Sequence, residues 1–258
     1  MPVLFIGHGS PMNAVETNSF TQTLGNLGKK LPKPDAIVCV SAHWMTDGIW
    51  VTHMAKPRTI HDFYGFPKEL FEIQYPAPGS PKTAELIKSL VRNPSITWDD
   101  QKWGLDHGTW SVLKHLYPNA DIPTIQLSIC MKESGEYHYQ IGEQLKKLRD
   151  QGVLILGSGN IVHNLRVINF DDENAKPFDW ATEFDEWSKK KLLARDHHAL
   201  CTEFNSTSAG KMSVPTVDHY YPLLPILGAS DPQDAVSFEY EGMQNASISM
   251  RAVGFGIR

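Results

Sequence analysis

The chain has 258 residues, a length that fits one large domain or two small ones. Its hydrophobic share is 41% and its charged share is 21%, which exclude the disordered and fibrous classes. The net charge of -5 is mild and no block of lysine or arginine stands out, so nothing in the charge pattern supports binding to nucleic acid or to a membrane surface.

The cysteines and the apolar runs exclude further classes of protein. Cys39, Cys130 and Cys201 are odd in number and far apart, which fits neither a disulfide framework nor a cysteine zinc site. No stretch approaches the ~20 apolar residues that a membrane span needs. The opening run at 1–6 is too short for a signal peptide and predicts a first strand. We therefore expect a cytoplasmic protein.

Strand-length apolar runs recur along the chain, and they are almost continuous, as in strands that are covered on both faces. They predict strands at 3–6, 36–40, 122–127 and 153–156, and a closing pair at 235–240 and 246–253. Helical spacing predicts helices at 20–31, 139–148 and 184–193, and a helix at 81–90 with Ser80 as its N-cap and Pro81 at its first position. The alternation predicts a three-layer α/β fold, a mostly parallel central sheet flanked by helices, in one domain over 1–258.

Histidines recur where predicted strands end. His8 and His43 each follow a predicted strand, and His163 lies shortly after a third, with glycines beside His8 and ahead of His163. Ligands of open α/β sheets bind beyond the carboxyl ends of the strands, so these side chains are expected to meet in one crevice. Imidazole is a ligand that suits Zn(II) and Fe(II), and the pattern therefore predicts a metal site.

Two further histidines are candidates for this crevice. A helix starting at Pro215 would carry Asp218 and His219 toward it, and His107 stands in a Gly- and Trp-rich segment. Any one histidine alone is more often a hydrogen-bonded core or surface residue. As a group, we expect His8, His43, His163 and His219 to share one metal site. The remaining histidines without such settings are expected to be structural or solvated: His53, His115, His138, His197 and His198.

Six short blocks occur in a recognisable order. They are GHGSPMN at 7–13, SAHW at 41–44, IHDFYGFP at 60–67, DHGTW at 106–110, GSGNIVHNL at 157–165 and DHYYPLL at 218–224. Together they resemble the DOPA 4,5-dioxygenase branch of the class III extradiol dioxygenases. The resemblance implies an enzyme that cleaves a catechol such as L-DOPA with O2 to a ring-opened semialdehyde. We expect a monomer or small homo-oligomer whose partners are only the catechol and O2.

The resemblance also implies residue roles. The family's first two metal ligands correspond to His8 and His43. His219 stands where protocatechuate-cleaving relatives have a glutamate, as it does in the DOPA branch, and the adjacent Asp218 is an alternative ligand. His163 matches the family's acid/base and is also a candidate fourth ligand in a resting zinc form. The glycine-rich segment 157–160 lacks the ending of a Walker motif, and we interpret it as a turn that aims His163.

Extradiol cleavage requires open metal positions for the catecholate and for O2. Three protein ligands leave enough positions, which favours His8, His43 and His219 as the working triad, with His163 as the acid/base. One divalent metal per chain is expected: Fe(II) for dioxygenase turnover, although Zn(II) fits the same ligands. His107 is expected to line the pocket and to hydrogen-bond the oxygen or the substrate hydroxyl.

An aromatic wall for the substrate ring is expected from Trp44 and the loop His61-Asp62-Phe63-Tyr64, with Trp44, His61 and Tyr64 as the substrate-binding residues. Ordinary core packing is an equally good interpretation of these residues. Two other functions stay open at this point. A zinc-dependent hydrolase could use the same histidines to activate water, but no His-Glu-x-x-His motif is present. A non-catalytic metal-binding protein would not need an acid/base beside the metal.

Overall fold

A computed structural model describes residues 1–257, so only Arg258 of the expected domain 1–258 lies outside the described residues. The main sheet has eight strands: β1 (Val3–Gly7), β2 (Ala36–Met45), β3 (Ile49–Thr52), β5 (Ile96–Asp99), β7 (Thr124–Ile129), β8 (Val153–Gly159), β9 (Val236–Tyr240) and β12 (Ala252–Phe255). Two small ribbons pair β4 (Arg58–Thr59) with β6 (Gly104–Leu105), and β10 (Met243–Gln244) with β11 (Ile248–Ser249).

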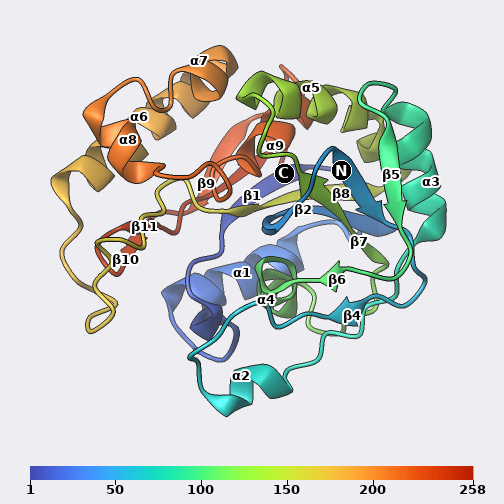
Figure 1. Cartoon of the computed structure of the whole chain (residues 1–258), viewed down its shortest axis with the longest axis horizontal. Coiled ribbons are helices and arrows are strands. Elements are labelled where there is room, and N and C mark those ends of the chain that lie inside the picture. Colours follow the sequence, from blue (N-terminus) through green and yellow to red (C-terminus); the bar gives the residue numbers. More distant parts are fainter. Residues whose placement is uncertain (258) are drawn as a thin grey trace.

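The strand order of the main sheet is β5-β3-β7-β2-β8-β1-β12-β9 (Figure 1). The central run β7-β2-β8-β1 is parallel throughout. At one side β12 pairs antiparallel with both β1 and β9, and at the other β3 is antiparallel to β7 and parallel to β5. The sheet is therefore mostly parallel in its buried centre, as the near-continuous apolar runs predicted.

Helices cover both faces of this sheet. They are α1 (Ser19–Lys30), α2 (Lys68–Glu72), α3 (Pro81–Leu90), α4 (His107–Leu116), α5 (Gly135–Leu145), α6 (Asp179–Ala194), α7 (His197–Thr202), α8 (Ser208–Ser213) and α9 (Leu223–Ala229), with the 3-10 helices η1 (Pro11–Ala14) and η2 (Lys146–Gln151). In Figure 1 α1 and α4 lie below the sheet, and α5 and α9 lie above it.

The three layers follow from the alternation of side chains along buried strands. In β1, Val3 and Phe5 join the apolar core that contains α5 and α9. Leu4 and Ile6 join the core that contains α1 and α4 on the opposite face. The three-layer single-domain α/β fold expected from the sequence is confirmed.

The helix at 81–90 is confirmed to the residue, with the Ser80 hydroxyl accepting a hydrogen bond from the Thr83 amide at 3.2 Å. The closing strand pair is also present, but its second strand is β12 rather than 246–253. Asn245 and Ala246 have φ angles of 53° and 66°, a left-handed pair that makes a tight turn. The turn joins β10 to β11 and delays the last strand of the main sheet.

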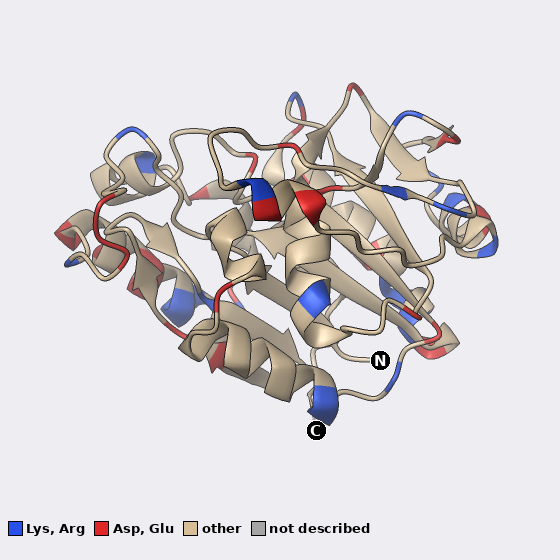
Figure 2. Cartoon of the chain, turned by 90° about the horizontal axis from the view of Figure 1, so that it is seen from below, with Lys and Arg blue, Asp and Glu red and all other residues tan. Residues whose placement is uncertain are grey.

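The distribution of charged residues over the surface agrees with the mild net charge. Basic and acidic residues are interspersed in the view of Figure 2. Within residues 1–257, no helix combines the length and the apolar character that crossing a membrane requires.

Candidate functional site

Five histidines converge at the carboxyl-terminal edge of the parallel strands: His8, His43, His107, His163 and His219. The ring centroids of His8 and His43 are 5.1 Å apart, and those of His43 and His107 are 3.9 Å apart. The His219 ring lies 5.3 Å from that of His8 and 5.0 Å from that of His43. The His163 ring stacks on His219 at 3.5 Å. The structure therefore brings together the histidines that the sequence analysis assigned to one site.

The strands place three of these rings. β1 and β2 both pair in parallel with β8, so the ends of these strands meet at one edge of the sheet. His8 directly follows β1, and His163 follows β8 after a short connection. His43 differs from the expectation, because β2 continues to Met45 and His43 lies inside the strand. The register of β2 against β7 shifts between Val40 and Met45, so the strand is irregular where it carries His43.

The glycine-rich segment before His163 is not a turn, as the sequence analysis interpreted it, but the end of β8. A Cβ atom on Gly159 would lie 2.1 Å from the carbonyl oxygen of His219, and one on Gly157 would lie 2.3 Å from that of Pro222. The Asn160 amide also donates to the His219 carbonyl at 2.8 Å. The glycines therefore allow the backbone that carries His219 to pack directly against β8.

The helix expected to start at Pro215 is not formed, because this segment follows bends and turns and α9 begins only at Leu223. The contact of the His219 carbonyl with the end of β8 satisfies this backbone outside a helix. His219 consequently reaches the site from a turn, and Asp218 beside it accepts a hydrogen bond from the His219 Nδ1 at 2.5 Å.

Hydrogen bonds determine which ring nitrogen of each histidine is free. The Ser158 hydroxyl donates its proton to the Gly108 carbonyl at 2.5 Å, so Nδ1 of His8, 3.0 Å away, must be the donor to Ser158. Nδ1 of His219 donates to Asp218 in the same way. Both rings therefore keep an unprotonated Nε2, which is the form that binds a metal.

Asp62 lies beside two further histidines, His107 and His43. Its Oδ2 accepts from Nδ1 of His107 at 2.9 Å and lies 3.4 Å from Nδ1 of His43, while its Oδ1 accepts from the His107 backbone amide at 2.9 Å. Burial alone would raise the pKa of Asp62, but the hydrogen bonds from His107 hold that pKa below its usual value. A charged Asp62 holds the Nδ1 proton of His107, which leaves Nε2 of that ring free, and its charge lies beside the His43 ring.

The Nε2 atoms of His8 and His43 face each other, 3.2 Å apart. Without a metal, Nε2 of His43 can carry a proton and donate it to the lone pair of His8. With a metal in place of that proton, both nitrogens can act as ligands. Two imidazole nitrogens bound to one tetrahedral Zn(II) at ~2.0–2.1 Å would be ~3.4 Å apart. This pair of residues therefore fits a single metal ion.

Candidate ligand atoms fall into two groups. His8, His43 and His107 offer nitrogens that all lie within 4.8 Å of one another, and His163, Asp218 and His219 form a second such group. In the three-histidine group His8 and His107 are buried and His43 is half-buried, and the group is free of thiolates, a ligand set that suits Zn or Fe.

Burial also keeps the imidazoles neutral. Desolvation, followed by the charge on His219, holds the pKa of His8 well below its usual value. Desolvation, followed by the charge on His107, also lowers the pKa of His43. Desolvation, followed by the charge on His219, lowers the pKa of His163. Neutral rings can accept a metal or a proton near pH 7.

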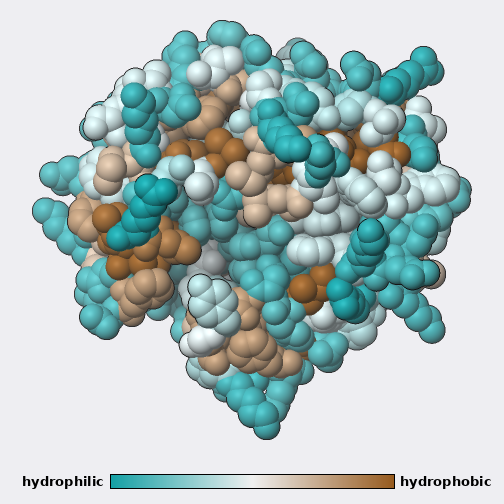
Figure 3. All heavy atoms as spheres, in the orientation of Figure 1, coloured by the Kyte–Doolittle hydropathy of each residue, from teal (hydrophilic) through white to brown (hydrophobic). Residues whose placement is uncertain are grey.

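The histidines open into a cavity of about 590 Å³. It is lined by His8, Gly9, Ser10, Pro11, Met12, Glu16, His43, Asp62, Phe63, Tyr64, Gly65, Phe66, His107, His163, Leu165, Ile168, Phe170, Glu173, His219, Gln244, Asn245 and Ile248. In Figure 3 the molecule is hollowed between the region around β10 and β11 and the loop before α2, and apolar residues gather on both sides. The size suits a small aromatic substrate.

The expected aromatic wall needs correction. Tyr64 lines the cavity, but Trp44 and His61 do not. Trp44 is 4% exposed and stacks on Trp103 at 5.7 Å, because successive side chains of β2 point to opposite faces and His43 takes the face toward the site. Nε2 of His61 donates to the Ile73 carbonyl at 2.9 Å, and the ring packs against Phe63 and Trp110.

Phe63 and Tyr64 of the expected loop line the cavity, and Phe66, which the sequence analysis did not assign to the wall, adds to the aromatic surface. The sequence analysis also missed Ser158, which orients His8, and two acidic residues of the cavity, Glu16 and Glu173. The block 157–165 contains Ser158, so position beside a candidate histidine was a usable signal there. The two glutamates have no local signal, because they meet only in the folded chain.

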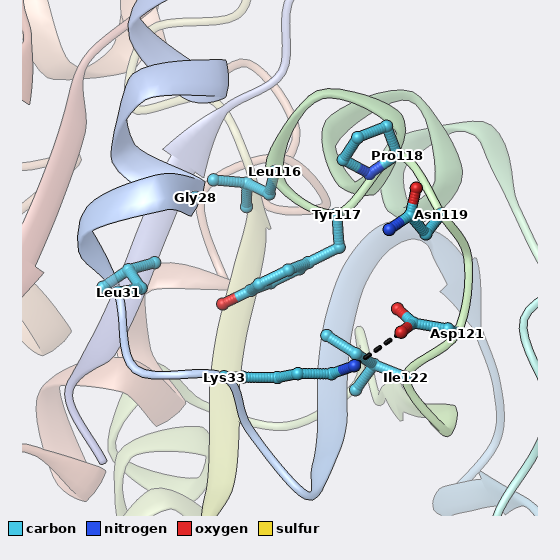
Figure 4. Close-up of a pocket in the computed structure, with 9 residues that line it drawn as sticks. All are labelled: Gly28, Leu31, Lys33, Leu116, Tyr117, Pro118, Asn119, Asp121 and Ile122. Carbon is cyan, nitrogen blue, oxygen red and sulfur yellow. Dashed lines mark hydrogen bonds and ion pairs between the residues drawn. The ribbon is translucent and has the colours of Figure 1, made fainter.

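A second cavity of about 200 Å³ lies between the end of α1 and the segment after α4 (Figure 4). Its charged residues, Lys33 and Asp121, already form an ion pair of 2.5 Å with each other. It holds none of the five clustered histidines, so the histidine-lined cavity is the candidate functional site.

Comparison with known proteins agrees with this geometry. A family model described as the catalytic LigB subunit of aromatic ring-opening dioxygenase matches residues 3–256. The chain belongs to this family. It is 45% identical to the 4,5-DOPA dioxygenase extradiol of Escherichia coli K12 over 99% of this chain and 95% of that protein. It is 37% identical to the 4,5-DOPA dioxygenase extradiol of Beta vulgaris over 88% of this chain and 85% of the relative.

A solved LigB-like fold is also similar. The crystal structure of an uncharacterized protein of Escherichia coli K12 superposes with a TM-score of 0.87 and 42% sequence identity, covering 99% of this chain and all 100% of that one. The family membership confirms the resemblance that the six sequence blocks indicated. The protein is an extradiol aromatic ring-opening dioxygenase of the LigB family, and its buried histidines could hold the metal that such enzymes use.

Proposed function

We propose that this LigB enzyme uses one divalent metal to cleave a catechol such as L-DOPA with O2, giving a ring-opened semialdehyde. The observation that carries the proposal is the pair of Nε2 atoms of His8 and His43, which lie 3.2 Å apart in the lining of the cavity. The relatives from Escherichia coli and Beta vulgaris, both named 4,5-DOPA dioxygenase extradiol, support L-DOPA as the first substrate to test.

We assign the metal to His8, His43 and His219. The His219 ring is within 5.3 Å of both other rings, and its Nδ1 is fixed by Asp218, which leaves Nε2 for the metal. The rival third ligand is His107, whose nitrogen belongs to the tighter group with His8 and His43. When bound, Fe(II) would supply open positions for the catecholate and O2, whereas Zn(II) would fit the same nitrogens without redox chemistry.

The chain's own groups handle the substrate protons. His163 is neutral because burial lowers its pKa, so its ring can take a proton from a catechol hydroxyl and later return it. His107 holds its Nδ1 proton toward Asp62, and its Nε2 can accept a hydrogen bond from the second hydroxyl. Phe63 and Tyr64 provide the surface on which the ring packs.

The proposal is tested by loading metal-free protein with Fe(II) under anaerobic conditions and then adding L-DOPA and air. We expect uptake of one O2 per catechol and a yellow product. The His8→Ala and His43→Ala variants should lose both the metal and the activity, while His198→Ala, which changes an exposed histidine, should retain both. Product formation by the Zn(II) form without uptake of O2 would instead favour the hydrolase.

A further inference from the structure

The cavity carries an acidic wall that the proposed reaction does not use. Glu16, just after η1, and Glu173, in the connection between β8 and α6, both line it, although they are distant in the sequence. A third carboxylate of the lining, Asp62, is already engaged by His107 and His43. Among residues 1–257, no lysine or arginine side chain lines this cavity. The clustered histidines mark the candidate ligand site, and the two glutamates make the adjoining wall of the cavity acidic.

Glu173 is held in place by a chain of hydrogen bonds that reaches the metal cluster. The Gln244 amide donates to its carboxylate at 2.5 Å and also donates to the Asn13 side chain at 3.3 Å. Asn13 in turn donates to the backbone carbonyl of His8 at 3.3 Å. The carboxylate therefore has a fixed position two side chains away from the backbone of a candidate metal ligand.

Glu16 has no such partner. Within the described part of the chain, its carboxylate makes no hydrogen bond and no ion pair. Burial, and after it the negative charge of Glu173, raises the pKa of Glu16. The charge of Glu173 acts on Glu16 in the cavity that both residues line, and within residues 1–257 no lysine or arginine of the lining offsets this repulsion. A positively charged group of a ligand would relieve this repulsion.

We propose that Glu16 and Glu173 form a subsite for the ammonium group of a catechol that bears an aliphatic amine, and that the enzyme thereby selects cationic over anionic catechols. The inference rests on the proposed function of the same cavity. A carboxylate on the substrate tail would approach two negative charges with no basic side chain in the lining to offset them. The carboxylate of an amino acid such as L-DOPA is therefore dispensable, whereas its amine is recognised.

Three catechols of similar size test the charge preference: 4-(2-aminoethyl)catechol, 4-ethylcatechol and 4-(carboxymethyl)catechol. For the Fe(II) enzyme, kcat/KM should be highest for the cation and lowest for the anion, with about a tenfold difference or more between these two. Raising the ionic strength should reduce the advantage of the cation over the neutral compound, because the pair is partly exposed. Equal values for all three catechols would overturn the proposal.

Glu16→Gln and Glu173→Gln keep the size of each side chain and remove its charge. Each should lower the ratio of kcat/KM for the cation to that for the neutral catechol by about fivefold. Asp171→Asn removes one negative charge from an exposed residue of the same loop that does not line the cavity, and should leave this ratio unchanged. A ratio that persists in both glutamine variants, or falls equally in the control, would contradict the subsite.

Anaerobic calorimetry of the same catechols separates this inference from the function on which it rests. If the Fe(II) enzyme takes up O2 neither with L-DOPA nor with any of the three catechols, the proposed function fails, but the anaerobic binding data still decide the subsite. Tighter binding of the amine than of the acid, lost in the glutamine variants, supports the subsite. Indistinguishable binding of the two compounds overturns it.

Discussion

Ser158 determines which nitrogen of His8 faces the cavity. The serine hydroxyl lies 3.0 Å from Nδ1 of His8 and gives its only proton to the carbonyl of Gly108, 2.5 Å away. Both side chains are buried, with exposures of 0% and 2%, so water cannot replace either partner. The geometry leaves His8 with a proton on Nδ1 and a lone pair on Nε2.

Replacing Ser158 by alanine should therefore weaken metal binding. The variant removes the acceptor for His8 Nδ1 and leaves the ring free to change its tautomer or rotate. Loss of such a supporting partner typically costs 10- to 100-fold in metal affinity, and we expect a loss of that size in a chelator competition titration. Ser89→Ala, which alters an exposed hydroxyl, is the control. An unchanged dissociation constant for Ser158→Ala would show that Ser158 does not orient His8.

The close contact of β8 with the turn before α9 gives a second test. In Gly159→Ala the new Cβ would lie 2.1 Å from the His219 carbonyl, so the turn must move and carry His219 with it. We expect a loss of stability and of metal content. Gly25→Ala is a matched control inside α1, where the nearest atom is 3.9 Å away, and should be neutral or stabilising by roughly 0.4–1 kcal/mol. If Gly159→Ala binds metal as well as the parent protein, the contact does not position His219.

Metal binding and proton transfer should separate between the two stacked histidines. His163→Ala is expected to retain Fe(II) and to bind catechol, while its kcat falls by ~100-fold or more, because a general acid/base typically contributes that much. His219→Ala should lose the metal first and activity as a consequence. Side-by-side metal titrations, with His107→Ala included, decide the third ligand. Equal metal loss in His163→Ala and His219→Ala would make His163 a ligand and move the acid/base role to His107.

The sequence predicted the fold and the meeting of the histidines for one physical reason. Buried parallel strands have near-continuous apolar runs, and their carboxyl ends share an edge of the sheet. His8 and His163 could be placed from this rule. The helix at 81–90 was predicted to the residue because Ser80 and Pro81 are strong local signals for a helix start.

The errors have a common origin in tertiary contacts. Gly157 and Gly159 have the composition of a turn, but they are strand residues because another backbone packs where their Cβ atoms would be. The strand predicted at 36–40 continues as β2 to Met45. The alternation of side chains along it turns Trp44, which was assigned to the substrate wall, away from the cavity. Glu16 and Glu173 share a cavity only through folding, which no local pattern records.

The buried His138 should make the free energy of unfolding depend on pH. Its Nδ1 donates to the Ser134 carbonyl at 2.9 Å, and its Nε2 accepts from the Cys130 amide at 3.2 Å, so the folded protein requires a neutral ring. Burial lowers the pKa of His138 to about 4, below its value of ~6.5 in the unfolded chain. The neutral ring therefore contributes fully above pH 6.5, and the contribution is lost as the pH falls toward 4.

This loss corresponds to about 3 kcal/mol in the free energy of unfolding. Urea titrations of metal-free protein between pH 7 and 4 should show a steeper decline for the parent than for His138→Gln. His198→Gln, at an exposed histidine, should follow the parent protein. Parallel pH profiles of parent and His138→Gln would contradict the assignment.

The most direct test of ring opening is the fate of labelled oxygen. Fe(II)-loaded enzyme should convert L-DOPA under ¹⁸O₂ with one O2 consumed per catechol, and one atom of the label should appear in the new carboxylate while the other enters the aldehyde. The carboxylate is the atom to measure by mass spectrometry, because aldehyde oxygen exchanges with water. Label in the carboxylate is the result that extradiol cleavage at the histidine cluster predicts. A product formed at full rate with no oxygen derived from O2 would contradict it.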